Sequence, residues 1–473
     1  MKKIYKIILL TLSLVMLVSC ASTPKKKKIK PLEIIKTDFG TIEKYELKNG
    51  IPVFYKKNTA NRINNVTICM NGGLRHLTKE TSGLEYAVVD CMAKSSHLYD
   101  ANTRQEYFNQ TNATINTLST ASASFLSLNV LDKYFSTMFP IFMDGFLHPN
   151  FATLFLNTQM EKMQKEIAER ELNPESLLFD IATQVLYKDH IFEITTYPTR
   201  TSIQNLTYEN MMAHVPLLQK AQDLSVFIVG NIDIDYFLNI LNLEINLGGL
   251  TADGEPLGPL EVPFVPLDKL NVFMKNTRMP GTAVIARAFY VPNVQDYSAQ
   301  LKADLTSSIF SKILYNVVRE KYGACYTPMS YILGGYSNVG LEVLFSVSDF
   351  ENFADYMEEA RQIMQKGLYI QSINPDGSFE LVPLQNKLQG FKNSYINSAF
   401  IDQKTTQGIA LNIANNYLLS NDFSNSHLIE TLKKITVEDI ITTFEKYWLQ
   451  EEDVWVSMGG DKEIEIIQSV LQQ

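Results

Sequence analysis

Two stretches of the sequence decide the fold. One is Leu206-Thr207-Tyr208-Glu209 followed by Val226-Phe227-Ile228-Val229-Gly230-Asn231, and the other is Ile435-Thr436-Val437-Glu438 followed by Trp455-Val456-Ser457-Met458-Gly459-Gly460. In each, the start of a helix precedes an apolar strand that ends in glycine. Thr207 to Gly230 and Thr436 to Gly459 are both twenty-three residues apart. The repeated spacing and character predict a duplicated α+β unit.

Local patterns predict the elements of the first unit. Residues 41–57 alternate around Lys48-Asn49-Gly50, which predicts a β-hairpin because Asn-Gly favours the primed turns. Val66 to Met70 form another strand, closed by Asn71-Gly72-Gly73. Ser82-Gly83-Leu84-Glu85 has the spacing of a capping box and predicts a helix through about Met92.

A later helix and the alternation of elements complete the fold class. Leu156, Met160, Met163 and Ile167 have the spacing of a core-facing helical stripe. Strands and helices alternate in blocks, so we expect an α+β fold of two duplicated halves, each a mainly antiparallel sheet packed against helices. The stretch 248–266, with four glycines and four prolines, is typical of a linker between the halves.

The N-terminus has the pattern of an export signal. A basic start precedes the apolar run Ile7 to Val18, too short to span a bilayer, and Leu17-Val18-Ser19-Cys20 resembles the bacterial lipobox. We therefore expect a signal peptide over residues 1–19 and a protein of the bacterial cell envelope, anchored through acyl chains on Cys20 at its periplasmic or surface face. Residues 20–37 form a lysine-rich tether, either resting on anionic head groups or simply solvated.

Composition excludes several classes of protein. The 473 residues are 45% hydrophobic and 20% charged, which excludes disorder for most of the chain. The net charge of −9 becomes −12 without the three leader lysines, which argues against nucleic-acid binding. After Cys20, an odd number of cysteines remains, Cys69, Cys91 and Cys325, and we expect them to be buried apolar groups rather than a disulfide framework.

The spacing of the histidines and of other reactive residues matches no common catalytic motif. The six histidines stand at positions 76, 97, 148, 190, 214 and 427, and no two lie within twenty residues of each other. No histidine pair can therefore share one helical face, and the sequence contains no local histidine metal motif. A glycine-rich phosphate loop and a Gly-x-Ser-x-Gly nucleophile elbow are missing as well.

A series of motifs along the chain nevertheless resembles the pitrilysin/insulinase family of inverted-zincin metallopeptidases. They are Gly72-Gly73-Leu74-Arg75-His76, the run Gly83 to Met92, Asn116-Thr117-Leu118-Ser119, the run Phe139 to Phe151 with Asp144 and His148-Pro149-Asn150-Phe151, Tyr187-Lys188-Asp189-His190, and Val318-Arg319-Glu320-Lys321-Tyr322-Gly323-Ala324-Cys325-Tyr326. The resemblance covers nearly all of the chain after the leader. It implies a metallopeptidase clamshell fold with an N-terminal domain over residues 38–247 and a C-terminal domain over residues 267–473.

The chain departs from the family's metal motif, His-x-x-Glu-His. That frame reads Tyr86-Ala87-Val88-Val89-Asp90, so both histidines and the base, at Val89, are lost. Glu166, eighty residues after Tyr86, stands where the resemblance places the third ligand, or is an ordinary helix carboxylate. Tyrosine is a poor zinc ligand and valine accepts no proton, so we expect no catalytic residue in the isolated chain and no cofactor, although zinc is the family's cofactor.

Two readings of the altered frame stay open from the sequence. Asp90 and Glu166 could hold a divalent ion, or Tyr86 and Asp90 could satisfy their polar atoms on neighbouring side chains.

Arg319 and Tyr326 match the family's Arg/Tyr motif. The resemblance implies that they reach the metal-bearing half of the enzyme and steady the substrate carbonyl and its oxyanion. Equally open are an arginine stabilised by the dipole of its helix and a packed tyrosine. The resemblance also implies that peptide adds to an edge strand near Asn116 and Ser119, and the small polar residues of Ile115 to Phe125 suit such a strand or a plain edge strand.

The expected function follows from this division of motifs. We expect a metallopeptidase homologue, inactive on its own, that binds peptide or unfolded protein. It would supply the Arg/Tyr half of a site to a zinc-bearing subunit of the same family or form a homodimer. The alternatives are a stand-alone peptide-binding lipoprotein and an active metallopeptidase with a rebuilt metal site.

Overall fold

The computed structural model describes residues 28–151, 153–252, 254–260, 270–292, 296–333, 338–420, 423 and 426–472. The signal sequence, Cys20 and residues 21–27 of the lysine-rich tether lie outside these residues, so the lipobox remains a prediction. The end of the stretch predicted as tether belongs to the fold, because Glu33–Thr37 form strand β1. Within the described ranges, no helix has both the length and the apolar character needed to cross a lipid bilayer.

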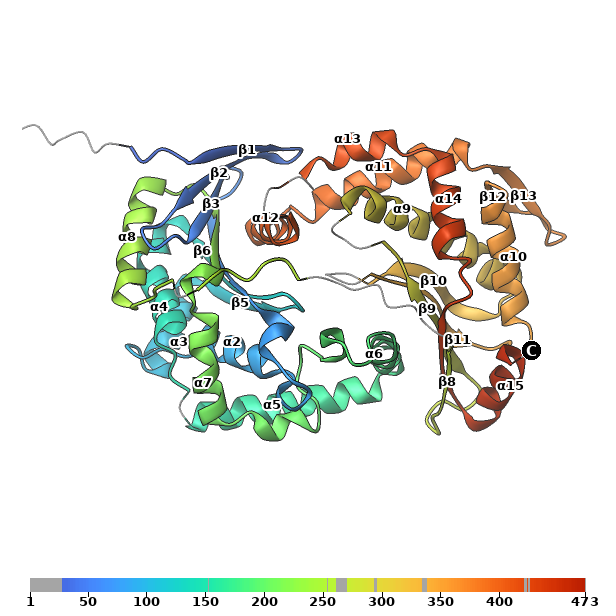
Figure 1. The fold of residues 1–473 in the computed structure, drawn as a ribbon, viewed down its shortest axis with the longest axis horizontal. Coiled ribbons are helices and arrows are strands. Elements are labelled where there is room, and N and C mark those ends of the chain that lie inside the picture. The colour runs from blue at the N-terminus through green and yellow to red at the C-terminus, as the bar shows by residue number, and fades with distance from the viewer. Residues whose placement is uncertain are drawn as a thin grey trace, which may run out of the picture.

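The N-terminal half is built on a sheet of seven strands (Figure 1). The strands are β1 Glu33–Thr37, β2 Gly40–Glu46, β3 Pro52–Lys57, β4 Ile63–Asn71, β5 Thr114–Ser119, β6 Ala123–Leu131 and β7 Leu224–Gly230. Their order is β1-β2-β3-β7-β4-β6-β5, and only the pair β3 and β7 is parallel. The predicted hairpin around Asn49-Gly50 is confirmed as the antiparallel pair of β2 and β3.

The C-terminal half repeats this topology. Its five-stranded sheet contains β8 Leu270–Lys275, β9 Ala283–Tyr290, β10 Cys325–Ile332, β11 Val339–Val347 and β14 Val454–Gly459. The order β10-β11-β9-β14-β8 is that of β5-β6-β4-β7-β3, and again only one pair, β14 with β8, is parallel. A separate two-stranded sheet pairs β12 Leu368–Ile373 with β13 Phe379–Pro383. The predicted duplication is therefore confirmed strand by strand, with β7 and β14 in equivalent places.

Helices cover both sheets. In the N-terminal half they are η1 Gly73–His76, η2 Lys79–Thr81, α2 Leu84–Lys94, α3 Ala101–Thr111, η3 Asp132–Tyr134, α4 Phe135–Leu147, α5 Thr153–Leu172, α6 Pro174–Leu186, η4 Ile191–Glu193, η5 Ser202–Asn205, α7 Tyr208–Leu218, η6 Ala221–Asp223 and α8 Ile234–Leu247. In the C-terminal half they are α9 Tyr297–Leu314, η7 Tyr315–Lys321, α10 Phe353–Gln365, α11 Gln385–Ile401, α12 Thr406–Ser420, α13 Leu428–Lys434, α14 Val437–Tyr447 and α15 Asp461–Leu471. Thr207 and Thr436 cap α7 and α14 with their side chains, as equivalent residues should.

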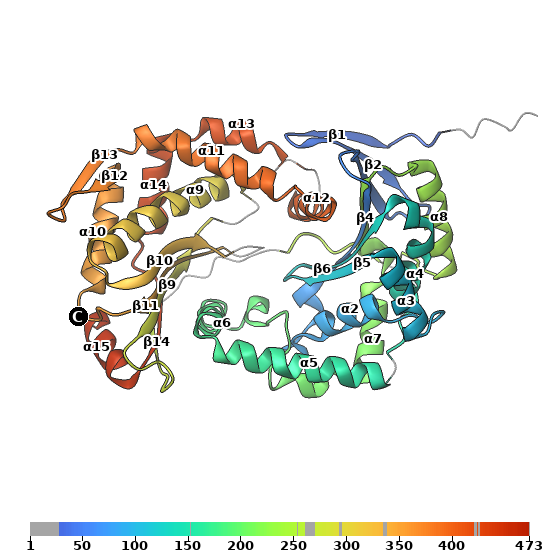
Figure 2. The same ribbon diagram turned by 180° about the vertical axis from the view of Figure 1, so that it is seen from behind.

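The two halves exchange one helix each. Helix α6 packs on β9 and β14 of the second sheet, and α12 packs on β4 and β7 of the first. Figures 1 and 2 show both helices between the two sheets, with the remaining helices outside. One apolar core therefore runs from the first sheet to the inner face of the second, while a second core fills the outer face of the second sheet.

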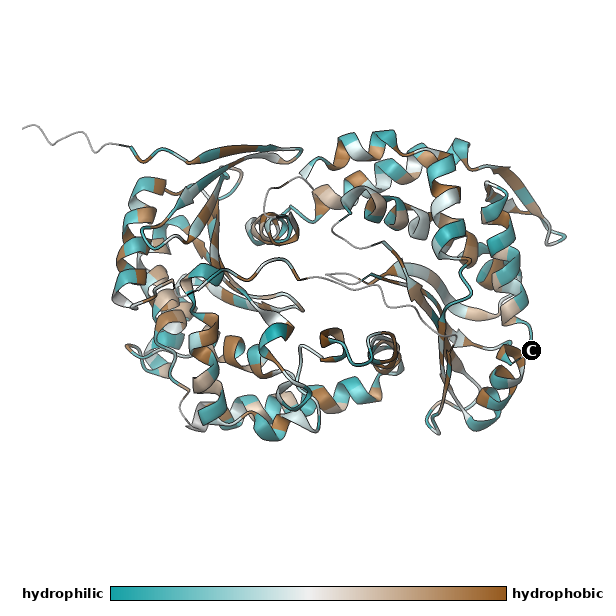
Figure 3. Cartoon of the chain, viewed as in Figure 1, coloured by the Kyte–Doolittle hydropathy of each residue, from teal (hydrophilic) through white to brown (hydrophobic). Residues whose placement is uncertain are grey.

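Strand β9 shows how one sequence serves both cores. Val284, Ala286 and Ala288 belong to the shared core, whereas Ala283, Ile285 and Phe289 belong to the outer one, as alternation along a strand requires. In Figure 3, the strands of both sheets carry much of the brown hydrophobic colour, and the outer helices alternate brown with teal. The predicted stripe of α5 is confirmed as well, with Met163 and Ile167 buried.

Two local predictions are wrong. Helix α2 begins at Leu84 after Gly83, which has a φ of 78° and makes no side-chain cap, so Ser82 and Glu85 form no capping box. Residues 115–125 are not one strand but parts of β5 and β6, because a tight turn separates them. In this turn the backbone N–H of Thr120 donates to the carbonyl of Ala123 at 2.8 Å. The three cysteines Cys69, Cys91 and Cys325 are buried and form no disulfide bond, as expected.

Candidate functional site

The frame of the lost metal motif lies on α2 and is closed by its own hydrogen bonds. The hydroxyl of Tyr86 donates to Oε2 of Glu166 on α5 at 3.2 Å, and Nζ of Lys162 lies 3.3 Å from the other oxygen, Oε1. Burial, followed by the charges of Glu166 and Asp90, raises the pKa of Tyr86, so the phenol remains neutral. Glu166 therefore does lie beside Tyr86, as the resemblance implies. Its carboxylate, however, accepts a hydrogen bond from Tyr86 and forms an ion pair with Lys162.

Asp90 is occupied in the same way. Nζ of Lys94 lies 2.5 Å from its Oδ2 and also donates to Oε1 of Gln159 at 2.8 Å. Val89, at the position of the family's base, is fully buried in the core. The four residues offer one neutral phenol, two carboxylates already paired with lysines, and an alkyl group. This donor set does not fit zinc, and the structure matches the reading in which Tyr86 and Asp90 satisfy their polar atoms on neighbours.

Arg319 and Tyr326 form a pair at the end of the long helix of the C-terminal half. Helix α9 runs directly into η7, a π-helical segment that contains Arg319, and Gly323 ends it with a φ of 61°. The guanidinium carbon of Arg319 lies 4.8 Å from the ring centroid of Tyr326 and 5.1 Å from that of Tyr315. Tyr326 is 68% exposed, and its hydroxyl makes no hydrogen bond to any described residue.

The structure does not bring this pair to the frame on α2. Arg319 contacts Tyr315, Glu320 and Tyr326, all in its own half. Within the described ranges, no hydrogen bond or ion pair joins Arg319 or Tyr326 to Tyr86, Asp90 or Glu166. The pair thus combines a cation with an exposed phenol, and it has no direct contact with the frame on α2 among the described residues.

Asn116 and Ser119 lie on β5, the last strand of the first sheet. Strand β5 pairs only with β6 in the described sheet, so its outer edge keeps unpaired backbone groups. Nδ2 of Asn116 donates to Oε1 of Gln407 on α12 at 2.8 Å, which fixes the side chain and leaves the strand edge open. The hydroxyl of Ser119 lies 2.9 Å from that of Ser124 on β6.

Ser124 connects this edge to a buried group that the sequence analysis missed. Its hydroxyl donates to Oε1 of Glu85 at 2.6 Å. Nδ1 of His76 lies 3.1 Å from Oε2 of Glu85, and Nε2 of His214 lies 3.5 Å from the same oxygen. One ligand atom from each of these three residues lies within 4.8 Å of the others.

The electrostatics of this group favour an ionised glutamate. Burial pushes the pKa of Glu85 upward, but His214, His76 and Ser124 approach the carboxylate closely enough to outweigh it, and the pKa ends below its ordinary value. Despite its proximity, Nε2 of His214 is buried and has no hydrogen-bond partner of acceptable geometry. A charged carboxylate and an unpartnered imidazole nitrogen therefore face each other in the interior.

The spacing of the sequence could not reveal this group, but weaker signals pointed to its members. His214 interrupts the apolar stripe that Met211, Val215 and Leu218 form on α7, where a polar residue needs a partner. Glu85 has the spacing of a capping-box partner, a role on the helix surface that would leave its carboxylate exposed rather than buried. The absence of a local histidine motif holds, yet histidines from η1 and α7 meet across α2.

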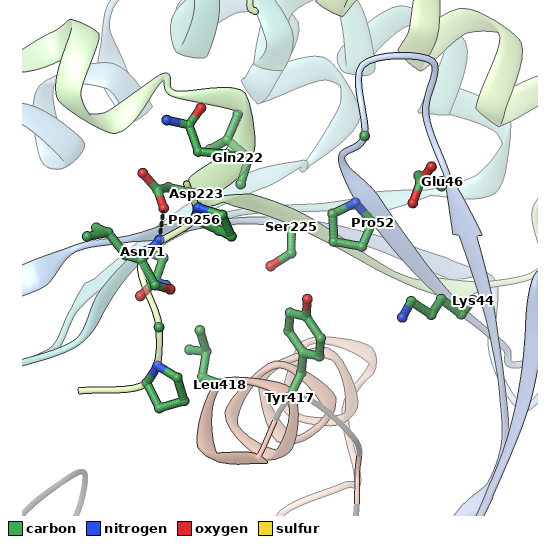
Figure 4. Close-up of a pocket in the computed structure, with 15 residues that line it drawn as sticks. Lys44, Glu46, Pro52, Asn71, Gln222, Asp223, Ser225, Pro256, Tyr417 and Leu418 are labelled. Atoms are coloured by element: carbon green, nitrogen blue, oxygen red, sulfur yellow. Dashed lines mark hydrogen bonds between the residues drawn. The ribbon is translucent and has the colours of Figure 1, made fainter. Parts of the chain in front are cut away.

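A separate pocket lies away from all of these residues (Figure 4). It occupies about 300 Å³ between α12 and the first strands of the N-terminal sheet and is lined by Ser225, Tyr417 and Asp223, among others. Oδ1 of Asp223 accepts a hydrogen bond from the backbone of Leu257 at 2.7 Å. None of the candidate site residues lines this pocket.

Comparisons with known proteins cover most of the chain. The profile of the insulinase family, peptidase family M16, matches residues 52–200, and that of the peptidase M16 inactive domain matches residues 205–369. An uncharacterised zinc protease of Bacillus subtilis, YmxG, is 20% identical over 399 residues, which are 84% of this chain and 94% of that protein. An uncharacterised zinc protease of Rickettsia felis is 20% identical over 405 residues, covering 85% and 93%.

Solved structures share the fold. A peptidase M16 inactive domain from Pseudomonas fluorescens superposes with a TM-score of 0.72 at 14% identity and covers 89% of this chain and 98% of its own. A protease from Helicobacter pylori gives 0.72 at 14%, covering 88% and 99%. The periplasmic protease PqqL from Escherichia coli gives 0.72 at 15%, covering 93% of this chain and 47% of its own. The matched profiles and the shared two-sheet architecture show that this chain belongs to the insulinase family of peptidases, family M16.

Proposed function

We propose that this chain is a non-catalytic member of the insulinase family that binds extended polypeptide and supplies Arg319 and Tyr326 to the site of a zinc-bearing partner. The observation that carries the proposal is the state of the metal frame. Tyr86 and Asp90 are bonded to Glu166 and Lys94, and Val89 is buried among apolar side chains, so this frame has neither ligands nor a base for hydrolysis.

The part of the family pattern that survives supports a role in trans. Arg319 and Tyr326 are held together at the end of η7, and the phenol hydroxyl has no partner among the described residues. Two donors in this arrangement suit a developing oxyanion. Since no direct contact joins them to the frame on α2 of the same chain, a second subunit of the family that carries zinc is the recipient in this proposal.

The open edge of β5 supports polypeptide binding. An extended segment can add to an edge strand through backbone hydrogen bonds, and the exposed residues of β5 are small or polar apart from Leu118. The lipobox predicted at Cys20 would anchor the protein, and with it this function, to a membrane of the cell envelope. The PqqL protease, a periplasmic protein by its description, shares the fold, which supports export.

The experiment is a reconstitution with peptidase activity as the readout. The full chain is purified from native membranes in mild detergent, together with any bound protein that carries an intact His-x-x-Glu-His motif. Cleavage of a quenched peptide library is measured for the chain alone, for the complex, and for complexes with Arg319→Ala. We expect activity only in the complex and its loss in the variant. Chelator-sensitive cleavage by the chain alone, or a complex indifferent to Arg319→Ala, would refute the proposal.

A stand-alone peptide-binding lipoprotein is the second candidate, and the open edge of β5 favours it equally. Recovery of peptides with the chain in the absence of any peptidase, at an affinity that Arg319→Ala lowers, distinguishes it from the first.

A further inference from the structure

Two histidines and a glutamate meet in the interior of the N-terminal half, on a face of α2 turned away from Tyr86 and Asp90. Glu85 directly precedes Tyr86, and neighbouring residues of a helix point about 100° apart. We propose that His76, Glu85 and His214 bind a divalent transition-metal ion, zinc being the best match. This site is independent of the proposed function above and uses none of the family's ligand positions.

The distances between the ligand atoms of His76, Glu85 and His214 are close to those around a bound zinc ion. Zinc bonds nitrogen and oxygen at about 2.0–2.2 Å, so two ligand atoms on a tetrahedral ion lie about 3.4 Å apart. Oε2 of Glu85 lies 3.1 Å from Nδ1 of His76 and 3.5 Å from Nε2 of His214. All three atoms lie within 4.8 Å of one another, so a modest approach of the two imidazoles completes the set.

The chemistry of the three groups selects the ion. Two imidazoles and one carboxylate form a common zinc ligand set, whereas calcium and magnesium prefer oxygen throughout. Only 2–3% of the Glu85 and His214 side chains is exposed, so the carboxylate charge lies in the interior. A cation at the centre would neutralise that charge and give Nε2 of His214 the partner that it lacks.

The backbone is shaped to bring His76 to this position. Gly72 has a φ of 154°, and a Cβ atom on it would lie 2.0 Å from Cε1 of His76, so only glycine lets the ring fold back over the loop. Gly73, with a φ of 57°, would clash with the carbonyl of Ala121 if it carried a side chain. The His76 side chain, 10% exposed, is the most open of the three and marks the way in from solvent.

The site would also act on the edge strand. Ser124 donates to Glu85 at 2.6 Å, and its single proton cannot serve Ser119 at the same time, so Ser119 must donate to Ser124. A metal on Glu85 would hold this chain of hydroxyls in one arrangement. The ion would thus stabilise the contact between η1, α2 and α7 and fix the Ser119 hydroxyl on β5.

Metal binding by the full chain in detergent tests the proposal directly. The protein is stripped with a chelator and titrated with Zn²⁺ by calorimetry, with elemental analysis and thermal unfolding in parallel. We expect one zinc per chain and a higher Tm with zinc. His76→Gln should weaken binding by at least about 100-fold, since even outer-shell partners are worth 10- to 100-fold. His97→Gln, at an exposed histidine outside the group, is the matched control and should leave binding unchanged.

A second variant tests the ligand itself, in case loss of a buried ligand impairs folding. His76→Cys loaded with Co²⁺ should show a near-ultraviolet thiolate-to-cobalt absorption band that the wild-type cobalt protein lacks, because thiolates bind such ions directly. Failure of the wild-type chain to bind zinc or cobalt would overturn the proposal. Zinc retained at full affinity by His76→Gln, or no thiolate band in His76→Cys, would overturn it as well.

Discussion

Removal of one leucine from the N-terminal half should loosen the sheet of the C-terminal half. Leu178 is fully buried on α6, the helix that packs on β9 and β14. With Ala182 and Leu186 it forms the buried stripe of that helix. Leu178→Ala therefore removes packing from a core that both halves share, although the residue belongs to the first half of the sequence.

The magnitude follows from complete burial. Leucine-to-alanine changes at buried sites cost about 2.7–5 kcal/mol, the loss growing with the cavity that remains. Because each 1.4 kcal/mol is a factor of ten, amides that exchange only through unfolding of this core should exchange roughly 100- to 4,000-fold faster. The affected amides include those of β9 and β14 in the other half, and also those of α6 itself.

Hydrogen exchange followed by mass spectrometry measures this effect segment by segment. Gln184→Ala, at an exposed position of the same helix, is the control and should change little. The reasoning is refuted if Leu178→Ala speeds exchange in α5 and α6 but leaves β9 and β14 at wild-type protection. Such a result would mean that the halves unfold independently and that the exchanged helices are only a surface contact.

Three further predictions concern charge and the Arg/Tyr pair. Glu342 is fully buried between Arg361, 2.5 Å away, and Arg287, 3.5 Å away, so Glu342→Gln should cost about 3–5 kcal/mol in urea denaturation by leaving buried arginines under-compensated. Burial, only partly offset by hydrogen bonds from Tyr395 and Gln300, raises the pKa of Asp304 above 3.8. The protonated Asp304 therefore contributes its full stabilisation below pH 3.8, and this stabilisation is lost as pH rises through the pKa of the folded state. Asp304→Asn should therefore gain stability relative to wild type over that pH rise. Urea midpoints of both proteins at several pH values measure the difference. Tyr326→Phe should lower kcat of an assembled complex by about 100-fold, the effect of losing one oxyanion donor, with an unchanged Tm because the side chain is 68% exposed.

The sequence predicted the features that depend on local order along the chain. The matched spacings from Thr207 and Thr436 identified the duplication because each helix and strand follows its neighbour directly. The family resemblance implied a position for Glu166 beside Tyr86, and the structure has it there. The sequence could not predict that α6 and α12 each pack on the sheet of the other half. An apolar stripe such as that of Leu178 shows that a helix face is buried but not which sheet covers it.

Helix α2 explains why the same sequence could lose one polar site and hold another. Its face toward α5 carries Tyr86 and Asp90, and both now serve as hydrogen-bonding groups of the fold. Glu85 lies one residue earlier, and its carboxylate meets groups from η1, β6 and α7 instead. Those partners come from segments far apart in the sequence, so no spacing rule links them. The frame from Tyr86 to Asp90, in contrast, spans five consecutive residues and can be read directly from the sequence. The absence of a local motif therefore limits where a metal can bind on this helix, and it leaves open the interior face that the tertiary fold assembles.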